Sequence, residues 1–283
     1  MPAPKAPVAL YIVATPIGNM EDITLRALRL LREVSLILAE DTRHTRQLLA
    51  RHGIETPVAS FHDHNERQKV DEMVRRLREG EAMALVTDAG TPLISDPGFV
   101  LVRAAAEAGV AVVPVPGASA VLAFLSAAGL PADRWTFVGF APRAEGERST
   151  AVASWLTAAG TSVCFESPHR VAALVAEIAR QAPTARVVAG RELTKQFEEF
   201  IRGTAAEVAA HLALAEPRGE FVVGISPPPP AGPPPDAEID GWIDALAEEG
   251  LRTKAIAKLL SKRLGLKSTE VYDRARARLT SSE

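Results

Sequence analysis

The chain lacks most of the features that would assign it quickly to a class. Among 283 residues it has one cysteine, 5% aromatic residues and a formal net charge of −3. One cysteine cannot form a disulfide within the chain, and Cys164 lies in an apolar run typical of a buried strand. We therefore expect a cytoplasmic protein. The small net charge gives no basic field over the whole molecule, so any contact with nucleic acid must depend on local patches.

Long uninterrupted apolar segments are also missing. The uncharged run from Ala108 to Ala132 has the length of a membrane span, which is about 20 residues. Pro114, Pro116 and Gly117 interrupt it near its start. The run therefore indicates a buried strand followed by a short helix, and we expect no membrane association.

Two common nucleotide-binding signatures are absent. The first apolar run ends at Thr15–Asn19, which holds a single glycine where dinucleotide-binding proteins have Gly-x-Gly-x-x-Gly. No Gly-Lys-Ser/Thr phosphate loop occurs. A pyrophosphate would lack its usual cradle, which weighs against an NAD-dependent oxidoreductase and against ATP. A ligand that contains adenosine without a pyrophosphate fits better.

What is present is an alternation of short apolar runs and helical segments. Such alternation predicts an α/β fold with a parallel sheet covered by helices over residues 1–117. Residues 118–226 repeat the alternation less regularly and favour a second domain with a mixed sheet. The strands are expected at Val8–Ala14, Ser35–Ala39, Thr56–Phe61, Glu81–Val86, Val110–Val115, Trp135–Phe140, Thr161–Phe165, Arg186–Ala189, Phe197–Arg202 and Gly219–Ile225.

The C-terminal part has a different composition. Residues 227–235 form a proline-rich linker, which we expect to be extended. Residues 236–283 predict a small tail of three helices. Between Leu251 and Thr280 the chain has nine Lys or Arg and two Asp or Glu. This local excess of positive charge suits contact with phosphates, and a merely solvated helical face is the alternative.

The segment Asp88–Gly98 is the strongest candidate for a binding loop. It follows an apolar strand, contains glycine, proline and threonine, and begins with an acid. In open α/β sheets such loops lie beyond the carboxyl ends of strands, where ligands bind. We expect the next helix to be capped by Ser95 or Asp96, to have Pro97 in its first turn and to end at Gly109. A capped turn without a ligand is the alternative.

Eight motifs, in order along the chain, resemble those of one family. They are T-P-I-G-N (Thr15–Asn19), A-E-D-T-R-H-T (Ala39–Thr45), H-D-H-N-E (His62–Glu66), D-A-G-T-P-L-I-S-D-P-G (Asp88–Gly98), P-G-A-S-A (Pro116–Ala120), F-E-S-P-H-R (Phe165–Arg170), R-E-L-T-K (Arg191–Lys195) and G-E-F-V (Gly219–Val222). The set is similar to that of the bacterial 16S ribosomal RNA cytidine 2′-O-methyltransferases, in the tetrapyrrole methylase superfamily.

This resemblance implies two α/β domains with S-adenosylmethionine in the cleft between them, usually in a homodimer. It also implies methylation of a cytidine ribose in the decoding region of 16S rRNA, within the small ribosomal subunit. The residues that the motifs place at the methyl donor are Pro16, Gly18, Asp88, Ala89, Gly90, Thr91, Pro92, Pro116, Gly117, Ala118, Ser119, Glu166, Ser167, Thr194, Gly219 and Glu220.

Transfer of a methyl group to a ribose oxygen needs alignment and an acceptor for the hydroxyl proton. No metal is expected, because a sulfonium is already activated. The candidate proton acceptors are Lys195 and Asp41, followed by His62, His64 and Glu192. Solvation or phosphate pairing is the alternative role of the lysine.

Basic side chains in the same motifs suit RNA phosphates, with surface ion pairs as the alternative. The candidates are Arg43, Arg46, Arg170, Lys254, Lys258, Lys262 and Arg263.

Three further interpretations stay open. The segment His62–His64, with His44, could supply metal ligands, although no second cluster supports it. The same scaffold could methylate a tetrapyrrole carbon, but that branch carries Gly-Asp-Pro where this chain has Asp88–Pro92, which favours RNA. Finally, a non-catalytic module could bind ribosomes through the basic tail alone.

Overall fold

The computed structural model describes residues 5–62, 65–214, 217–227, 234–264 and 266–280. It divides the chain into one compact unit over residues 1–227 and a second over residues 228–283. Most of the expected linker, residues 228–233, lies outside the described residues. The division of the first unit into domains at residue 117 stays a prediction.

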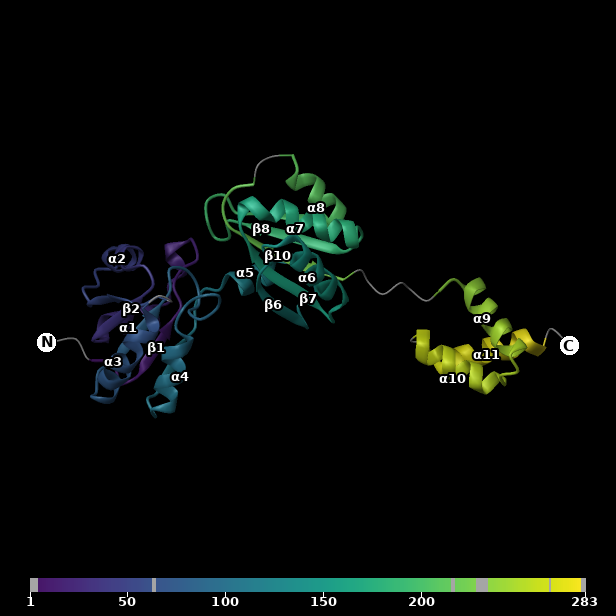
Figure 1. Ribbon diagram of the computed structural model, residues 1–283, viewed down its shortest axis with the longest axis horizontal. Coiled ribbons are helices and arrows are strands. Elements are labelled where there is room, and N and C mark those ends of the chain that lie inside the picture. Colours follow the sequence, from purple (N-terminus) through teal and green to yellow (C-terminus); the bar gives the residue numbers. More distant parts are fainter. Residues whose placement is uncertain (1–4, 63–64, 215–216, 228–233, 265, 281–283) are drawn as a thin grey trace. The chain divides into compact units, whose positions relative to one another are not determined.

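The first sheet is entirely parallel, as the alternation predicted. Its strands run in the order β3-β2-β4-β1-β5, which places β1 and β4 in its interior. Figure 1 shows helices around this sheet. Its elements are β1 (Leu10–Val13), the short 3-10 helix η1 (Met20–Asp22), α1 (Leu25–Glu33), β2 (Leu36–Ala39), α2 (Thr42–Arg51), β3 (Val58–Ser60), α3 (Glu66–Arg78), β4 (Met83–Val86), α4 (Phe99–Glu107) and β5 (Val112–Val115).

Alternate residues of each strand in this sheet serve two separate cores. In β4, Ala84 and Val86 pack with α1 and α2, whereas Met83 and Leu85 pack with α3 and α4. Both faces are therefore covered, which explains why the strands are almost continuously apolar. Covered faces leave the ends of the strands as the place where a ligand can approach the sheet.

The second sheet is mixed and has the order β6-β7-β10-β8-β9. Strands β6 and β7 are parallel, while β10 and β8 pair antiparallel with their neighbours. Its elements are α5 (Ala120–Ala128), β6 (Trp135–Phe140), α6 (Glu145–Thr157), β7 (Thr161–Glu166), α7 (Pro168–Gln181), β8 (Arg186–Arg191), β9 (Glu199–Thr204), α8 (Ala205–Leu212) and β10 (Phe221–Ser226).

One helix covers one face of the second sheet by itself. Helix α5 packs against the face that carries Val163, Val188 and Val222, and α6, α7 and α8 pack on the other. Gly190 and Gly224 leave the room that the ring of Phe124 fills, since a Cβ at either glycine would lie within 2.8 Å of that ring. Alanine at either position is expected to displace α5.

The predicted start of α4 is wrong. Neither Ser95 nor Asp96 caps the helix, Pro97 is not in its first turn, and the N-cap is Gly98 at φ +123° with no side-chain cap. A carboxylate from α3 pairs with the first turn of the helix instead: Glu66 Oε1 accepts a hydrogen bond from the backbone N–H of Val100 at 3.0 Å. The start of α4 therefore does not depend on a capping side chain from the loop before it.

The uncharged run from Ala108 to Ala132 forms β5 and α5, which are separate elements. In the parts of the chain that the structure describes, no helix combines the length and the apolar character needed to cross a bilayer.

The C-terminal unit is a small bundle of α9 (Asp236–Glu248), α10 (Thr253–Leu264) and α11 (Ser268–Thr280). Its core includes Ile243, Ile256 and Leu260. Arginines of α11 pair with the acids of α9: Arg274 reaches Asp240 at 2.6 Å. The tail prediction of three helices is thus confirmed. The positive charge of α11 is partly neutralised within the bundle, while Lys254, Lys258, Lys262 and Arg263 on α10 are exposed.

Candidate functional site

Loops that follow the strands of the first sheet are joined to one another. After β1 and β4, the backbones of Thr15 and Gly90 exchange two hydrogen bonds, at 2.9 and 3.0 Å. The Thr15 hydroxyl donates to the carbonyl of Thr87 at 3.0 Å. Gly90 adopts φ +84°, which favours glycine. These bonds hold the Asp88 loop in a fixed position beyond the carboxyl ends of the strands.

A loop of the second sheet meets this region. The backbone N–H of Asn19 donates to the Thr194 hydroxyl at 3.0 Å, and a Cβ on Gly18 would collide with the side chain of Lys195. Glu192 and Thr194 both have left-handed backbone conformations, at φ +50° and +64°. Non-glycine residues adopt such conformations at a cost, and they cluster at functional sites. The loop Glu192–Lys195 is therefore held in a strained shape against the segment that follows β1.

Two adjoining pockets lie where these loops meet. The first, called the apolar pocket, has a volume of about 400 Å³ and is lined by Ile17, Ala89, Gly90, Thr91, Ile94, Ser95, Asp96, Ser119, Ala120, Val121, Phe140, Phe165, Glu166, Ser167, Pro168, Leu193, Glu220, Phe221 and Val222. The second, called the charged pocket, has about 340 Å³ and is lined by Thr15, Pro16, Ile17, Gly18, Met20, His44, Thr45, Leu48, Thr87, Asp88, Ala89, Lys195 and Glu220.

The apolar pocket contains a buried carboxylate with an unused oxygen. The side chain of Glu166 is 1% exposed, and its Oε1 lies 2.6 Å from Arg170 Nη2 and accepts from the N–H of Ser167 at 2.7 Å. Its Oε2 is buried and has no hydrogen-bond partner in the structure. A buried acceptor left unpaired costs about 1–3 kcal/mol, and more when charged. This oxygen therefore requires a donor, which a ligand in the pocket can supply.

The charged pocket contains a lysine held by two carboxylates. Lys195 Nζ lies 2.9 Å from Glu192 Oε1 and 3.0 Å from Glu220 Oε2. Burial disfavours the ammonium, but the hydrogen bonds to Glu192 and Glu220 outweigh it, so the pKa of Lys195 is raised. The same bond from Lys195 lowers the pKa of Glu192. Lys195 is thus a fixed positive charge at neutral pH.

The acids of the first sheet brace its loops. Asp88 Oδ1 accepts from the backbone N–H of Asp41 at 3.0 Å, which joins the loops after β4 and β2. Asp41 caps α2 and forms a 2.7 Å ion pair with Arg43, and the hydrogen bonds from Arg43 hold its pKa well below the usual range. Asp88 therefore braces the loop, and the residue also lines the charged pocket.

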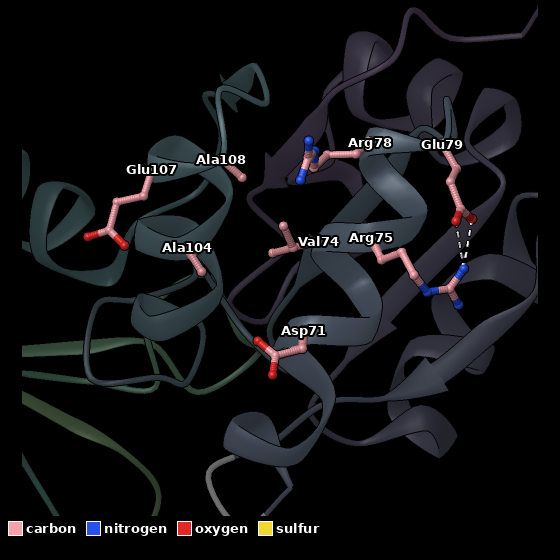
Figure 2. Close-up of a pocket in the computed structure, with 8 residues that line it drawn as sticks. All are labelled: Asp71, Val74, Arg75, Arg78, Glu79, Ala104, Glu107 and Ala108. Carbon is pink, nitrogen blue, oxygen red and sulfur yellow. Dashed lines mark hydrogen bonds and ion pairs between the residues drawn. The ribbon is translucent and has the colours of Figure 1, made fainter.

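A third hollow is larger but lies elsewhere. It has about 660 Å³ and lies between the C-terminal halves of α3 and α4, where Val74 faces Ala104 and Ala108 (Figure 2). Arg75 and Glu79 at its edge pair with each other at 2.8 Å. In a parallel βα sheet the C-terminal ends of helices lie beside the amino ends of strands, away from the usual ligand edge. We therefore place the site in the apolar and charged pockets.

The residues predicted at the methyl donor are divided between the two pockets. The apolar pocket is lined by Ala89, Gly90, Thr91, Ser119, Glu166, Ser167 and Glu220, and the charged pocket by Pro16, Gly18, Asp88, Ala89 and Glu220. The remaining ones line neither pocket: Pro92, Pro116, Gly117, Ala118, Thr194 and Gly219. Of the two favoured proton acceptors, Lys195 lines the charged pocket and Asp41 lines neither. Their roles in binding and catalysis stay predictions.

Several of the predicted residues that do not line a pocket support the loops that line one. Gly117 lies against the residue that follows β1, since a Cβ there would come within 2.9 Å of the Cβ of Ala14. The carbonyl of Ala118 accepts from the Thr91 hydroxyl at 3.1 Å. Gly219 has φ +84° and leaves space for the side chain of Glu192. These positions support the site from outside it.

Sequence reasoning did not identify the apolar walls of the first pocket. Phe140 is the last residue of β6 and Phe165 the last but one of the neighbouring β7, and the centroids of their rings lie 5.6 Å apart. His44 was considered only as a metal ligand, although it lines the charged pocket.

The three arginines expected at RNA have different surroundings. Arg170 is used within the protein: it pairs with Glu166 and donates to the Ala141 carbonyl and the Ser167 hydroxyl. Arg43 and Arg46 are exposed on α2. The structure gives Arg170 a positioning role beside Glu166, and RNA contact by any of the three stays a prediction.

The possible metal cluster falls partly outside the described residues, which exclude Asp63 and His64. Among the residues that are described, no group of three potential ligands could hold a metal ion.

The two α/β sheets form a fold that solved structures share. A diphthine synthase aligns with a TM-score of 0.62 at 15% identity, over 77% of this chain and 89% of that one. A uroporphyrin-III C-methyltransferase from Thermus thermophilus, solved with S-adenosyl homocysteine, gives 0.54 at 22% identity, over 77% and 97%. The family model of the tetrapyrrole (corrin/porphyrin) methylases matches residues 9–209.

Curated relatives narrow the class. A protein from Neisseria meningitidis serogroup B named "Ribosomal RNA small subunit methyltransferase I" is 44% identical over 94% of this chain and 92% of its own length. One of the same name from Pseudomonas aeruginosa is 43% identical over 94% and 96%. The chain belongs to the tetrapyrrole methylase family and, within it, to the ribosomal RNA small subunit methyltransferase I group. The resemblance seen in the eight motifs is thereby confirmed.

Proposed function

We propose that this protein transfers a methyl group from S-adenosylmethionine to the 2′-oxygen of a cytidine ribose in the decoding region of 16S rRNA. The name of its relatives supports a small-subunit rRNA substrate, and the motif resemblance supports the ribose oxygen. The observation that carries the proposal is the pair of adjoining pockets, which have different chemistry and share a wall of Ile17, Ala89 and Glu220. A group transferred between two bound molecules needs such an arrangement.

The apolar pocket suits the methyl donor. Its aromatic and aliphatic walls can enclose an adenine, and backbone groups of Gly90 and Thr91 can approach closely because the residues there are small. Glu166 Oε2 accepts a hydrogen bond from a ribose hydroxyl or amine of the ligand, which satisfies the unpaired oxygen. When bound, S-adenosylmethionine supplies a methyl group that is activated by its sulfonium.

The charged pocket suits the acceptor nucleotide. It is smaller, and polar groups from His44, Asp88 and Lys195 line it. The fixed position of Lys195, held by two carboxylates, allows it to orient a hydroxyl and to stabilise the negative charge that develops on the attacking oxygen. Its raised pKa weighs against Lys195 as the proton acceptor, because an acceptor must first be neutral.

RNA phosphates are proposed to contact two separate surfaces. Exposed Arg43 and Arg46 lie on α2, near His44 of the charged pocket. Exposed lysines repeat every four residues along α10, at Lys254, Lys258 and Lys262, and so lie on one face of the helix. A homodimer in the cytoplasm remains part of the proposal, on the basis of the family resemblance.

The test is methyl transfer to a defined substrate. Small ribosomal subunits purified from a strain without this protein are incubated with labelled S-adenosylmethionine and the full chain, and the modified position is mapped by a ribose-specific method. The expected result is one methyl group per subunit on a cytidine 2′-oxygen. Label on a base, or transfer only to a porphyrin-like macrocycle, would contradict the proposal. Binding of subunits without affinity for S-adenosylmethionine would favour the non-catalytic module.

A further inference from the structure

We infer that Glu220 is the catalytic residue that accepts the proton of the ribose hydroxyl. This inference rests on the proposed function and adds a residue role to it. In the motif comparison Glu220 was expected only to bind the methyl donor. Its location in the structure indicates a different part in the reaction.

The location is defined by the wall that the two pockets share. If the donor occupies one pocket and the acceptor the other, the reacting atoms meet at the boundary between them. Ile17, Ala89 and Glu220 line both pockets. Glu220 is the titratable one of the three, so it is the group at the boundary that can exchange a proton.

Other titratable side chains line one pocket each. His44, Asp88 and Lys195 line the charged pocket, whereas Asp96 and Glu166 line the apolar one. Lys195 carries a proton, for the reasons given above. Asp88 is bonded to the backbone of the β2 loop, and Glu166 is paired with Arg170. Within the described part of the site, none of these side chains lines both pockets.

The surroundings of Glu220 support a chemical role. Its side chain is 80% exposed, so it can meet a substrate, and its backbone is fixed by an exchange of hydrogen bonds with Glu192 at 3.0 Å. Lys195 holds Oε2 at 3.0 Å. The same ammonium therefore lies beside both the proton acceptor and the oxygen that loses the proton.

The step balances as a single displacement. A bond forms between the ribose 2′-oxygen and the methyl carbon, the bond from that carbon to sulfur breaks, and its electron pair stays on sulfur. The hydroxyl proton passes to the Glu220 carboxylate, which becomes a neutral acid. Release of that proton to solvent restores the enzyme, and this is open to Glu220 because it is largely exposed.

Glu192 offers a matched control for the experiment. Both carboxylates bond to Lys195, at 2.9 and 3.0 Å, but Glu192 lines neither pocket. The variants Glu220→Gln and Glu192→Gln each remove one negative charge beside the lysine, and only the first removes the carboxylate at the boundary. Single-turnover rates on small subunits, donor affinity by calorimetry and the pH dependence of the rate are measured for both variants and for Glu220→Asp.

The inference predicts that Glu220→Gln lowers the methyl-transfer rate by about 100- to 10,000-fold, the range of a general base. Donor affinity should change less than about threefold. The wild type should lose rate at acid pH, and this variant should not. Glu220→Asp should recover part of the rate, and Glu192→Gln should keep more of it than Glu220→Gln.

Three results would overturn the inference. Equal losses in both glutamine variants would mean that Glu220 acts only through Lys195. A loss of donor affinity with an unchanged rate at saturation would return Glu220 to a binding role. An unchanged rate in Glu220→Gln would exclude it altogether. Absence of methyl transfer to RNA by the wild type would instead remove the proposed function itself.

Discussion

The apolar and charged pockets share a wall but are built in opposite ways. The apolar pocket contains one buried carboxylate oxygen, Glu166 Oε2, which has no hydrogen-bond partner. Aromatic and aliphatic side chains also line this pocket. In the charged pocket, Lys195 is already paired with Glu192 and Glu220, and Asp88 with the backbone of Asp41. An unmet acceptor favours tight and specific binding of a small ligand, whereas a fixed charge favours stabilisation of a reacting group. The difference therefore separates binding of the donor from chemistry on the acceptor.

After Glu220→Gln, the largest expected effect tests the charge of Lys195. Lys195→Ala should lower the methyl-transfer rate by about 100- to 1,000-fold, as removal of an oxyanion-stabilising group does, while donor affinity stays within about threefold. Lys195→Arg should restore much of the rate, since arginine keeps the charge and cannot act as a base at neutral pH. Single-turnover kinetics measure both. Equal loss in the two variants would favour the lysine as proton acceptor instead.

The next effect tests the unpaired oxygen. Glu166→Gln should weaken binding of S-adenosylhomocysteine about 10- to 100-fold, the loss expected when a charge-assisted hydrogen bond is removed. The rate at saturating donor should change little. Calorimetric titration of the full chain measures the affinity. Glu207→Gln is the control, because Glu207 is a capping-box carboxylate on α8 that lines neither pocket. Equal weakening in the two variants would break the distinction between the pockets.

A smaller effect is expected at the RNA surface of α10. Lys258→Gln combined with Lys262→Gln should reduce the slope of log affinity against log salt by about 1–2 without changing donor affinity. Filter binding to small-subunit rRNA at several salt concentrations measures it. The control removes the same number of positive charges from the hollow between α3 and α4, with Arg75→Gln and Arg78→Gln (Figure 2). A slope that falls only in the control would contradict the role of α10.

The smallest effect concerns stability. Lys195→Met should lower the free energy of unfolding by about 1–2 kcal/mol at neutral pH, since one of its two partners is well exposed. The raised pKa of Lys195 means that the contribution is complete below 10.5, the ordinary lysine value, and is lost as the pH rises through the raised one. The lowered pKa of Glu192 means that it is present above 4.5 and is lost as the pH falls through the lowered value. Denaturant unfolding across this range should therefore show the wild-type advantage at intermediate pH and its loss at both ends. An advantage independent of pH would contradict the ion pair.

Local signals predicted much of the fold. The strand β6 was predicted with the bounds that the structure has, Trp135–Phe140. The start of α4 was not, because its first turn is satisfied by Glu66, which lies 34 positions from its partner Val100. Such a contact leaves no mark in the local pattern.

The site was predicted as a region and not as two pockets. The Asp88 loop was placed correctly beyond a strand end, since that depends on strand order alone. The different chemistry of the two pockets could not be predicted from the sequence, because it depends on contacts between distant segments. The bond from Asp41 to Asp88 spans 47 positions, and that from Lys195 to Glu220 spans 25. The unused oxygen of Glu166 became apparent only after Arg170 and Ser167 were seen to occupy the other.

A crystal structure of the protein with S-adenosylhomocysteine is the most direct test of the assignment of the two pockets. We predict that the nucleoside lies in the apolar pocket, with a ribose hydroxyl or an amine within hydrogen-bond distance of Glu166 Oε2, and that the sulfur lies toward Glu220. A nucleoside bound beside Lys195 in the charged pocket, with Glu166 Oε2 still unpaired, would contradict it.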